Sequence, residues 1–171
     1  CAHKCLISEG RRGICKVRGN HGGKLFSLTY GKLIAAHVDP IEKKPLFHFY
    51  PGSSSFSIAS AGCNFRCEWC QNWEISQEYG QESIDGTAET PPEAVIASAK
   101  RSHCQSISYT YTEPTVFFEY SYDVSKFAHT AGLKNVYVTN GYMSQEMIDL
   151  YTPLLDAANV DIKDSSVKAL I

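Results

Sequence analysis

From Phe56 onward, short apolar runs with strand character alternate with segments whose apolar residues recur at helical spacing. This alternation predicts strands at 56–60, 106–111, 135–139 and 159–163, and helices at 91–102, 117–131 and 144–151. Strands that alternate with helices pair in parallel, because each right-handed crossover returns the chain to the same end of the sheet. The sequence therefore predicts an α/β fold in which helices cover a parallel sheet.

Several residues suit the ends of the predicted helices. Thr90-Pro91-Pro92-Glu93 has the pattern of a capping box with proline at the first helical position. Gly132 is expected to end the second helix, and Ser144 to cap the third. These signals predict where the crossovers begin and end.

The first 54 residues have a different character from the rest of the chain. Residues 1–23 are rich in Cys, Gly, Lys and Arg, and short β-type runs follow at 25–30, 33–38 and 46–50. We expect a small antiparallel extension there. The predicted organisation is a Cys-rich N-terminal extension over 1–54 and an α/β core over 55–171.

Composition excludes several classes of protein. The 171 residues are 43% hydrophobic and 20% charged, as in one folded domain. The formal charge of −2 gives no field that would attract nucleic acid or anionic lipid, so we expect neither nucleic acid nor membrane as a partner. No run approaches the about 18 apolar residues of a membrane span.

Cysteine usage is the distinctive part of the composition. Seven cysteines cannot all pair within the chain, and six fall in two tight clusters, which suits metal sites better than disulfides. The clusters are Cys1, Cys5 and Cys15, and Cys63, Cys67 and Cys70. Without a secretory signal, this usage predicts a reducing, cytoplasmic location.

Polar residues follow each predicted strand of the core. The second cysteine cluster follows the first strand, and the later strands are followed or ended by Thr112, Glu113, Asn140, Asp161 and Lys163. The carboxyl ends of parallel strands lie along one edge of a sheet, where α/β proteins place their sites. We therefore expect one site at this edge.

The loop Cys63-x3-Cys67-x2-Cys70 places three thiolates within eight residues. Soft thiolates bind zinc, copper or iron–sulfur clusters. A structural zinc site takes four ligands, so a zinc knot here would need a distant fourth ligand such as Cys104 or a histidine. An iron–sulfur cluster held by three thiolates would keep one iron open to an exchangeable ligand.

This loop after the first strand of a β/α repeat resembles the radical S-adenosylmethionine (radical SAM) superfamily. Further motifs resemble its glycyl-radical activating branch, typified by pyruvate formate-lyase activating enzyme: Cys70-Gln71-Asn72, Thr139-Asn140-Gly141 and Asp161-Ile162-Lys163. The N-terminal cysteines are closer still to the radical SAM enzymes of AmmeMemoRadiSam gene systems, as are 47–52 and 111–115. The resemblance implies a partial (β/α) barrel.

The resemblance also implies a chemistry. The three cysteines of the loop would hold a [4Fe–4S] cluster whose open iron binds S-adenosylmethionine (SAM). An electron from a donor such as flavodoxin or ferredoxin would then cleave SAM to a 5′-deoxyadenosyl radical, which abstracts hydrogen from an unknown substrate. The alternative within the family is an activase acting on a glycine of a protein substrate. The alternative outside it is a zinc-stapled binding module without redox chemistry.

Individual residues receive roles by the same resemblance. Those implied to contact the cofactor are Phe65, Trp69, Asn72, Thr112, Glu113, Asn140, Asp161 and Lys163. Glu113 would accept the SAM ammonium, Lys163 would pair with the SAM carboxylate, and Asp161 would help to bind a monovalent cation. Tyr111-Thr112 replaces the family's two glycines, and Val138 stands where activating enzymes have an acidic residue.

Each role has a structural alternative. Glu113 also suits a helix N-cap, and Asn140-Gly141 an ordinary turn. Asp161 and Lys163 would equally suit a solvated strand end, and Trp69 a core position.

The first cluster, with His3 between Cys1 and Cys5, predicts a second metal site that binds zinc or an auxiliary iron–sulfur cluster. Free thiols are the alternative. The chain starts at Cys1 and supplies four of the usual six barrel units, so we expect a truncated piece of a longer protein that binds iron and cleaves SAM poorly.

Overall fold

The computed structural model describes residues 1–163, apart from the side chain of Gln81. Its centre is a five-stranded sheet in the order β3-β4-β5-β6-β7. The strands are β3 (Leu33–Pro40), β4 (Ser54–Ser60), β5 (Ser106–Tyr109), β6 (Lys134–Thr139) and β7 (Ala157–Val160). β4 to β7 pair in parallel, and β3 runs antiparallel to β4 at one edge.

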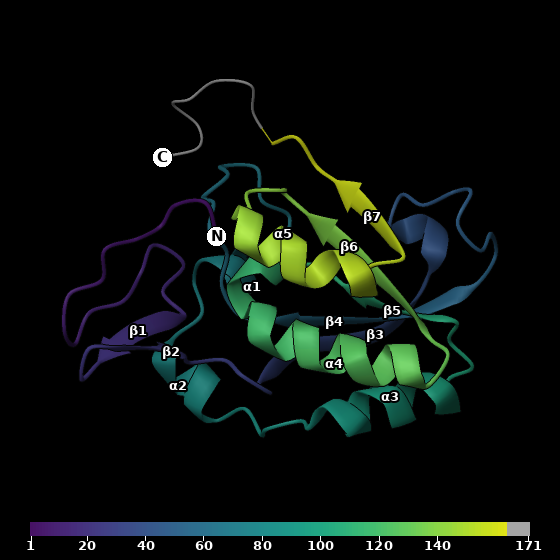
Figure 1. Cartoon of the computed structure of the whole chain (residues 1–171), viewed down its shortest axis with the longest axis horizontal. Coiled ribbons are helices and arrows are strands. Elements are labelled where there is room, and N and C mark those ends of the chain that lie inside the picture. The colour runs from purple at the N-terminus through teal and green to yellow at the C-terminus, as the bar shows by residue number, and fades with distance from the viewer. Residues whose placement is uncertain (164–171) are drawn as a thin grey trace.

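Three helices connect the parallel strands, and Figure 1 shows them together on one face of the sheet. They are α3 (Pro92–Arg101), α4 (Phe118–Thr130) and α5 (Gln145–Tyr151), with a short 3₁₀ helix at Pro114–Phe117 before α4. The predicted α/β fold with a mostly parallel sheet is confirmed, and it has the arrangement of a partial β/α barrel. Residues 164–171 of the expected core lie outside the described residues.

Several predicted boundaries are confirmed and others are wrong. Pro92 is the first residue of α3, and Gly132 has the positive φ of +77° that favours glycine after a helix. The capping box at Thr90–Glu93 is wrong, because Pro91 is the N-cap and no side chain caps the helix. Ser144 is the N-cap of α5, but its hydroxyl does not cap the helix either.

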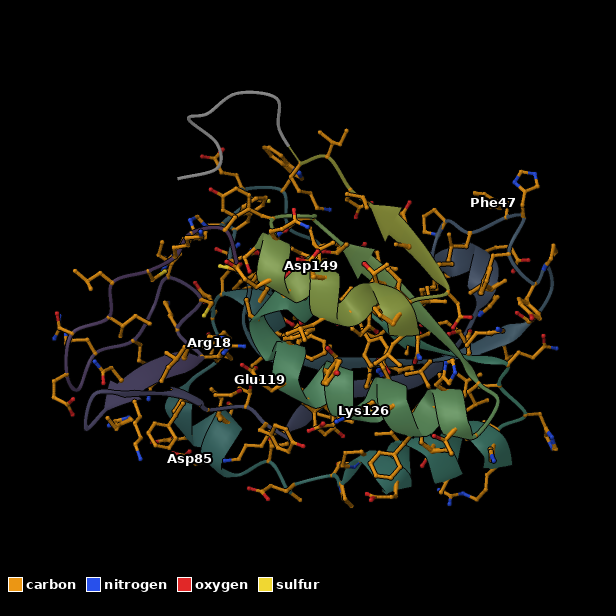
Figure 2. All side chains as sticks on the ribbon, in the orientation of Figure 1. Arg18, Phe47, Asp85, Glu119, Lys126 and Asp149 are labelled. Carbon is orange, nitrogen blue, oxygen red and sulfur yellow. The ribbon has the colours of Figure 1, made fainter. Side chains whose placement is uncertain are left out.

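The predicted strand at 46–50 is also wrong. These residues form bends and turns between the 3₁₀ helix Ile41–Lys43 and β4, and Figure 2 shows Phe47 at the outer edge of this segment. Alternating aromatic residues suggested a strand, but Pro45 and Pro51 remove backbone donors on either side. The fourth core strand ends at Val160, so Asp161 and Lys163 follow it rather than end it.

The two faces of the sheet are chemically different. Ile58, Ile107, Tyr109 and Tyr137 belong to the buried core beneath the helices. Successive strand residues point to opposite faces. The alternate residues on β4 and β5 therefore face away from the helices, and they are small: four serines, Ser55, Ser57, Ser106 and Ser108, with Ala59.

The N-terminal part forms a two-stranded hairpin, β1 (Arg18–His21) with β2 (Lys24–Ser27). The guanidinium of Arg18 makes a bidentate ion pair with the Glu119 carboxylate of α4, and Figure 2 shows the two side chains facing each other. Two short helices, α1 (Trp73–Ser76) and α2 (Gln81–Asp85), follow the cysteine loop. Within residues 1–163, no helix combines the length and apolar character that crossing a bilayer requires.

Candidate functional site

A cavity of about 440 Å³ opens beside the carboxyl ends of the parallel strands. Its wall combines the cysteine loop, the residues that follow β5, β6 and β7, and the segment after β3. The predicted site residues that line it are Cys63, Phe65, Cys67, Trp69, Cys70, Asn72, Thr112, Glu113, Asn140, Asp161 and Lys163. The structure therefore brings to one cavity all the residues expected there from four separate segments.

The cysteine loop starts from a glycine that no other residue could replace without movement. Gly62 has a φ of +99°, and a Cβ atom there would lie 2.8 Å from Cγ1 of Val17. Its N–H donates to the carbonyl of Ile75 at 3.0 Å. The sharp turn directs the chain from the end of β4 into the cavity wall, where Cys63 follows.

The three thiols of the loop are free and half-buried. Burial raises the pKa of Cys63 to about 12, although the N–H of Phe65 donates to its sulfur at 3.4 Å and opposes the shift. Burial also raises the pKa of Cys67. The thiols of Cys63 and Cys67 therefore lose their protons less readily than an ordinary cysteine, and a positive metal centre would stabilise their thiolates.

The donor set tests which metal the loop would suit. Over residues 1–163, no three Cys, His, Asp or Glu side chains stand in the arrangement of metal ligands. The cavity wall holds three thiols and, among the described residues, neither a histidine nor a fourth cysteine. Cys104 is buried in the core under the helices. Three soft donors without a fourth suit a [4Fe–4S] cluster with one open iron better than a closed zinc site.

Glu113 is buried and accepts hydrogen bonds from three neighbours. Oε1 accepts from the N–H of Thr115 at 3.0 Å, from Oγ1 of Thr115 at 2.6 Å and from Oγ1 of Thr139 at 2.7 Å, while Oε2 accepts from the N–H of Asn140 at 2.8 Å. Burial raises the pKa of Glu113, and these hydrogen bonds oppose the shift. Glu113 caps the 3₁₀ helix Pro114–Phe117, so the structural alternative for this residue is present. Oε2 accepts one hydrogen bond, so it is the oxygen that can accept another.

Asn64 holds the cysteine loop against the end of β6, and sequence reasoning did not identify it. Its Oδ1 accepts from Nδ2 of Asn140 at 2.7 Å, and its carbonyl oxygen pairs with Nε2 of His3 at 2.9 Å. Nδ2 of Asn64 donates to the carbonyl of Tyr142 at 3.4 Å. Its place inside the motif, directly after Cys63, was the only available signal.

The Thr139-Asn140-Gly141 segment forms a turn, as expected from the alternative in which Asn140-Gly141 is an ordinary turn. Gly141 has a φ of +72°, and Oδ1 of Asn140 accepts from the N–H of Tyr142 at 3.0 Å. The Asn140 amide nitrogen faces Asn64, so both ends of this side chain already have protein partners. The turn therefore fixes the edge of the cavity.

The remaining predicted residues differ in exposure and partners. The rings of Phe65 and Tyr142 lie 5.4 Å apart at their centroids, whereas Trp69 is 62% exposed and is not a core residue. Nδ2 of Asn72 donates to the carbonyl of Tyr111 at 2.9 Å, and Oγ1 of Thr112 donates to the backbone carbonyl of Ser60 at 2.7 Å.

Asp161 and Lys163 form an ion pair with each other at 2.9 Å. Both line the cavity and are partly exposed, so the alternative of a solvated strand end describes them as well. Sequence reasoning did not place Lys43 and Lys44 in the cavity wall, where they lie together with Tyr111. A pair of lysines in a loop carries no distinctive pattern.

The N-terminal cysteines line a second cavity of about 490 Å³ together with His3 and Glu119. Burial raises the pKa of Cys15, and Nε2 of His3 is engaged by the carbonyl of Asn64. Among the described residues, no three Cys, His, Asp or Glu side chains stand here in the arrangement of metal ligands either. Cys1, Cys5 and Cys15 line this one cavity, and the second metal site stays a prediction.

Comparison with known proteins identifies the family. Residues 57–169 match the Radical SAM superfamily. The chain is 48% identical over 166 residues to an uncharacterised protein of Methanocaldococcus jannaschii, covering 97% of this chain and 49% of that protein. It is 31% identical over 133 residues to the 7-carboxy-7-deazaguanine synthase of Thermococcus kodakarensis, covering 69% of this chain and 52% of the synthase.

A second uncharacterised protein of Methanocaldococcus jannaschii is 29% identical over 119 residues, covering 67% of this chain and 30% of that protein. The chain thus spans about half or less of the length of these curated relatives. The family match covers the parallel strands, the cysteine loop and the cavity wall beyond it. The chain belongs to the radical SAM superfamily.

Proposed function

We propose that this chain is the cluster-binding part of a radical SAM enzyme, in which Cys63, Cys67 and Cys70 hold a [4Fe–4S] cluster. The observation that carries the proposal is the shared cavity: three thiols without a fourth Cys or His ligand among the described residues lie in the same wall as Glu113 and Lys163. When bound and reduced, such a cluster supplies the electron that cleaves SAM to methionine and a 5′-deoxyadenosyl radical, which takes a hydrogen atom from the substrate.

The chain's own residues would position SAM around the open iron. Oε2 of Glu113 would accept the SAM ammonium, since that oxygen accepts a single hydrogen bond in the structure. Lys163 would exchange Asp161 for the SAM carboxylate, a change that costs little for a partly exposed ion pair. Phe65 and Trp69 would shield the cluster and the adenine from water.

The finer assignments are part of the same proposal. The motifs at 47–52 and 111–115 favour a radical SAM enzyme of the AmmeMemoRadiSam type, with a cytoplasmic flavodoxin or ferredoxin as electron donor. Two domains, an extension over 1–54 and a core over 55–171, remain the proposed organisation. In the structure, β3 of the extension pairs with β4 of the core.

Anaerobic reconstitution with iron and sulfide tests the proposal. The wild-type protein is expected to turn brown and to give, once reduced, an EPR signal that SAM alters. Cys63→Ala, Cys67→Ala and Cys70→Ala are each expected to lose this signal, whereas Cys104→Ala is the matched control because Cys104 lies in the core away from the cavity.

Iron held by the N-terminal cysteines must be measured separately. A variant with Cys1, Cys5 and Cys15 all changed to Ala would keep the SAM-sensitive EPR signal if the proposal holds. A colourless, zinc-only protein, or an unaltered signal in the Cys63 variant, would refute the proposal and favour the zinc-stapled module.

A further inference from the structure

A buried cluster of charged groups lies in the segment after β3. Asp39, near the end of this strand, accepts hydrogen bonds from Nζ of Lys44 at 2.7 Å and from Nζ of Lys43 at 2.9 Å. The hydroxyl of Tyr111 also donates to Oδ2 of Asp39. Lys44 is 2% exposed, and its ammonium lies 4.6 Å from the centroid of the Tyr111 ring.

The sheet provides the space for this cluster. Asp39 is the cross-strand partner of Ser55, and Ser55 is the partner of Ser106, so these three side chains share the face opposite the helices. Serine side chains are small, whereas the interior positions of β/α barrels usually carry bulky apolar residues. The inner face of this sheet is therefore built around polar groups.

The cluster belongs to the wall of the same cavity as the three thiols. Lys43, Lys44 and Tyr111 line that cavity. The Tyr111 carbonyl accepts a hydrogen bond from Asn72, two residues after Cys70, which connects the cluster to the cysteine loop. Tyr111 also has a φ of +64°, a strained conformation for a residue other than glycine.

The charges of the cluster do not balance. Two ammonium groups share one carboxylate, and the neutral Tyr111 hydroxyl adds none, so the cluster carries a net charge of +1. The other carboxylates in the wall are engaged, Asp161 by Lys163 and Glu113 by hydrogen-bond donors. Lys43 is the accessible member, with 63% of its side chain exposed.

We propose that Lys43, with Lys44 behind it, binds an oxyanionic group of the second substrate, a carboxylate or a phosphate. This inference rests on the proposed function, because it concerns the molecule that would donate hydrogen in that cavity. Asp39 and Tyr111 act as positioning residues that hold Lys44 in the wall. An oxyanion bound by Lys43 would balance the net charge of +1 of this cluster.

A titration of metal-free protein under reducing conditions tests the subsite. The probes are inorganic phosphate and acetate, and the readout is the ¹³C shift of the lysine Cε atoms in lysine-labelled protein. Saturable shifts of the Lys43 signal are expected with at least one probe. The probe that binds with the lower dissociation constant identifies the oxyanion as a phosphate or a carboxylate. Lys43→Gln is expected to weaken binding about tenfold or more.

Lys126→Gln is the matched control. Lys126 is half-exposed and pairs with Asp123 at 2.7 Å, much as Lys43 pairs with Asp39, but it lies on α4, which Figure 2 shows on the helical side of the sheet. Its substitution is expected to leave probe binding unchanged. Equal weakening in both variants, or no saturable shift with either probe, would overturn the proposal.

Two further measurements distinguish this proposal from a SAM-carboxylate role for Lys43 and from the proposed function itself. In reconstituted protein, SAM is expected to leave the bound probe in place, and displacement of the probe by SAM would show that Lys43 serves the SAM carboxylate instead. Since the titration uses protein without metal, a preparation that takes up no iron would refute the proposed function while the oxyanion measurement stands by itself.

Discussion

The backbone N–H of Asn140 donates a 2.8 Å hydrogen bond to Oε2 of Glu113, across 27 positions of sequence. The two residues follow neighbouring parallel strands, β5 and β6, so this bond ties two strand ends together at the cavity. Glu113 thereby both fixes the edge of the site and presents a carboxylate to it.

Glu113→Gln should destabilise the protein although glutamine has nearly the same shape. Glutamine keeps one oxygen, but its amide nitrogen takes the place of the other and cannot accept, so the hydrogen bond from Asn140 at Oε2 or those from Thr115 and Thr139 at Oε1 are lost. We expect a loss of about 2–4 kcal/mol in the free energy of unfolding, measured with urea. Glu146→Gln, an exposed change at the start of α5, should cost less than about 0.5 kcal/mol.

Gly62→Ala should disturb the entry to the cysteine loop. The new Cβ would lie 2.8 Å and 2.9 Å from the two methyl groups of Val17, at a φ of +99°. Gly132→Ala also falls at a positive φ but meets open space, so it isolates the conformational cost of about 1 kcal/mol. Thermal unfolding should show the larger loss for Gly62→Ala, and equal losses would mean that the contact with Val17 relaxes freely.

Asn64→Ala should loosen the cysteine loop from the turn after β6. The change leaves Nδ2 of Asn140 without its 2.7 Å partner, at a cost of about 1–3 kcal/mol. Faster amide hydrogen exchange is expected at Asn140 and Tyr142. Asn64→Asp keeps the Oδ1 acceptor for Asn140, although it replaces the 3.4 Å donor to the Tyr142 carbonyl with a buried carboxylate oxygen. Exchange at Asn140 should therefore stay slower than in the alanine variant. If the aspartate variant exchanges as fast as the alanine variant, the Asn140 contact does not fix the turn.

The sequence predicted the core well because alternation of strands and helices is a local pattern with a global consequence. Four strands, three crossovers and a shared edge followed from apolar runs and from the polar residues at their ends, and the cavity at that edge collects residues from each of these segments. Strand order needed no long-range information, because each crossover placed the next strand beside the previous one.

The part of the cavity wall formed by Lys43, Lys44 and Tyr111 could not be predicted in this way. Lys44 is buried because Asp39 and Tyr111 surround it, and Tyr111 lies 72 positions from Asp39 in the sequence. Asn64 and Asn140 pair across 76 positions. Such contacts depend on the folded sheet. Phe47 and Phe49 illustrate the converse error, because alternation suggested a strand where nearby prolines favour bends.

Asp39→Asn should make stability depend differently on pH. Burial by itself raises the pKa of Asp39, but hydrogen bonds from Lys44, Tyr111 and Lys43 outweigh it and hold the pKa well below its ordinary value. A carboxyl group with a lowered pKa stabilises the folded state above its unfolded pKa of about 3.9, and this stability is lost as pH falls through the folded pKa. The asparagine variant lacks this contribution and leaves the buried Lys44 ammonium without its carboxylate, so at about pH 7 we expect a loss of about 3–5 kcal/mol.

The comparison of urea unfolding curves over pH isolates the charge pair. The difference between wild type and Asp39→Asn should shrink as pH falls below about 4, because Asp39 of the unfolded wild type then takes up a proton, whereas the folded protein keeps the carboxylate ionised until its much lower pKa is reached. It should also shrink at high pH, since burial lowers the pKa of Lys44 and the variant regains stability once that ammonium loses its proton. Asp123→Asn removes a more exposed partner of a lysine and should cost at most about 1 kcal/mol. A difference between wild type and Asp39→Asn that stays constant over the whole range would mean that Asp39 contributes packing and hydrogen bonds but no charge interaction with Lys44.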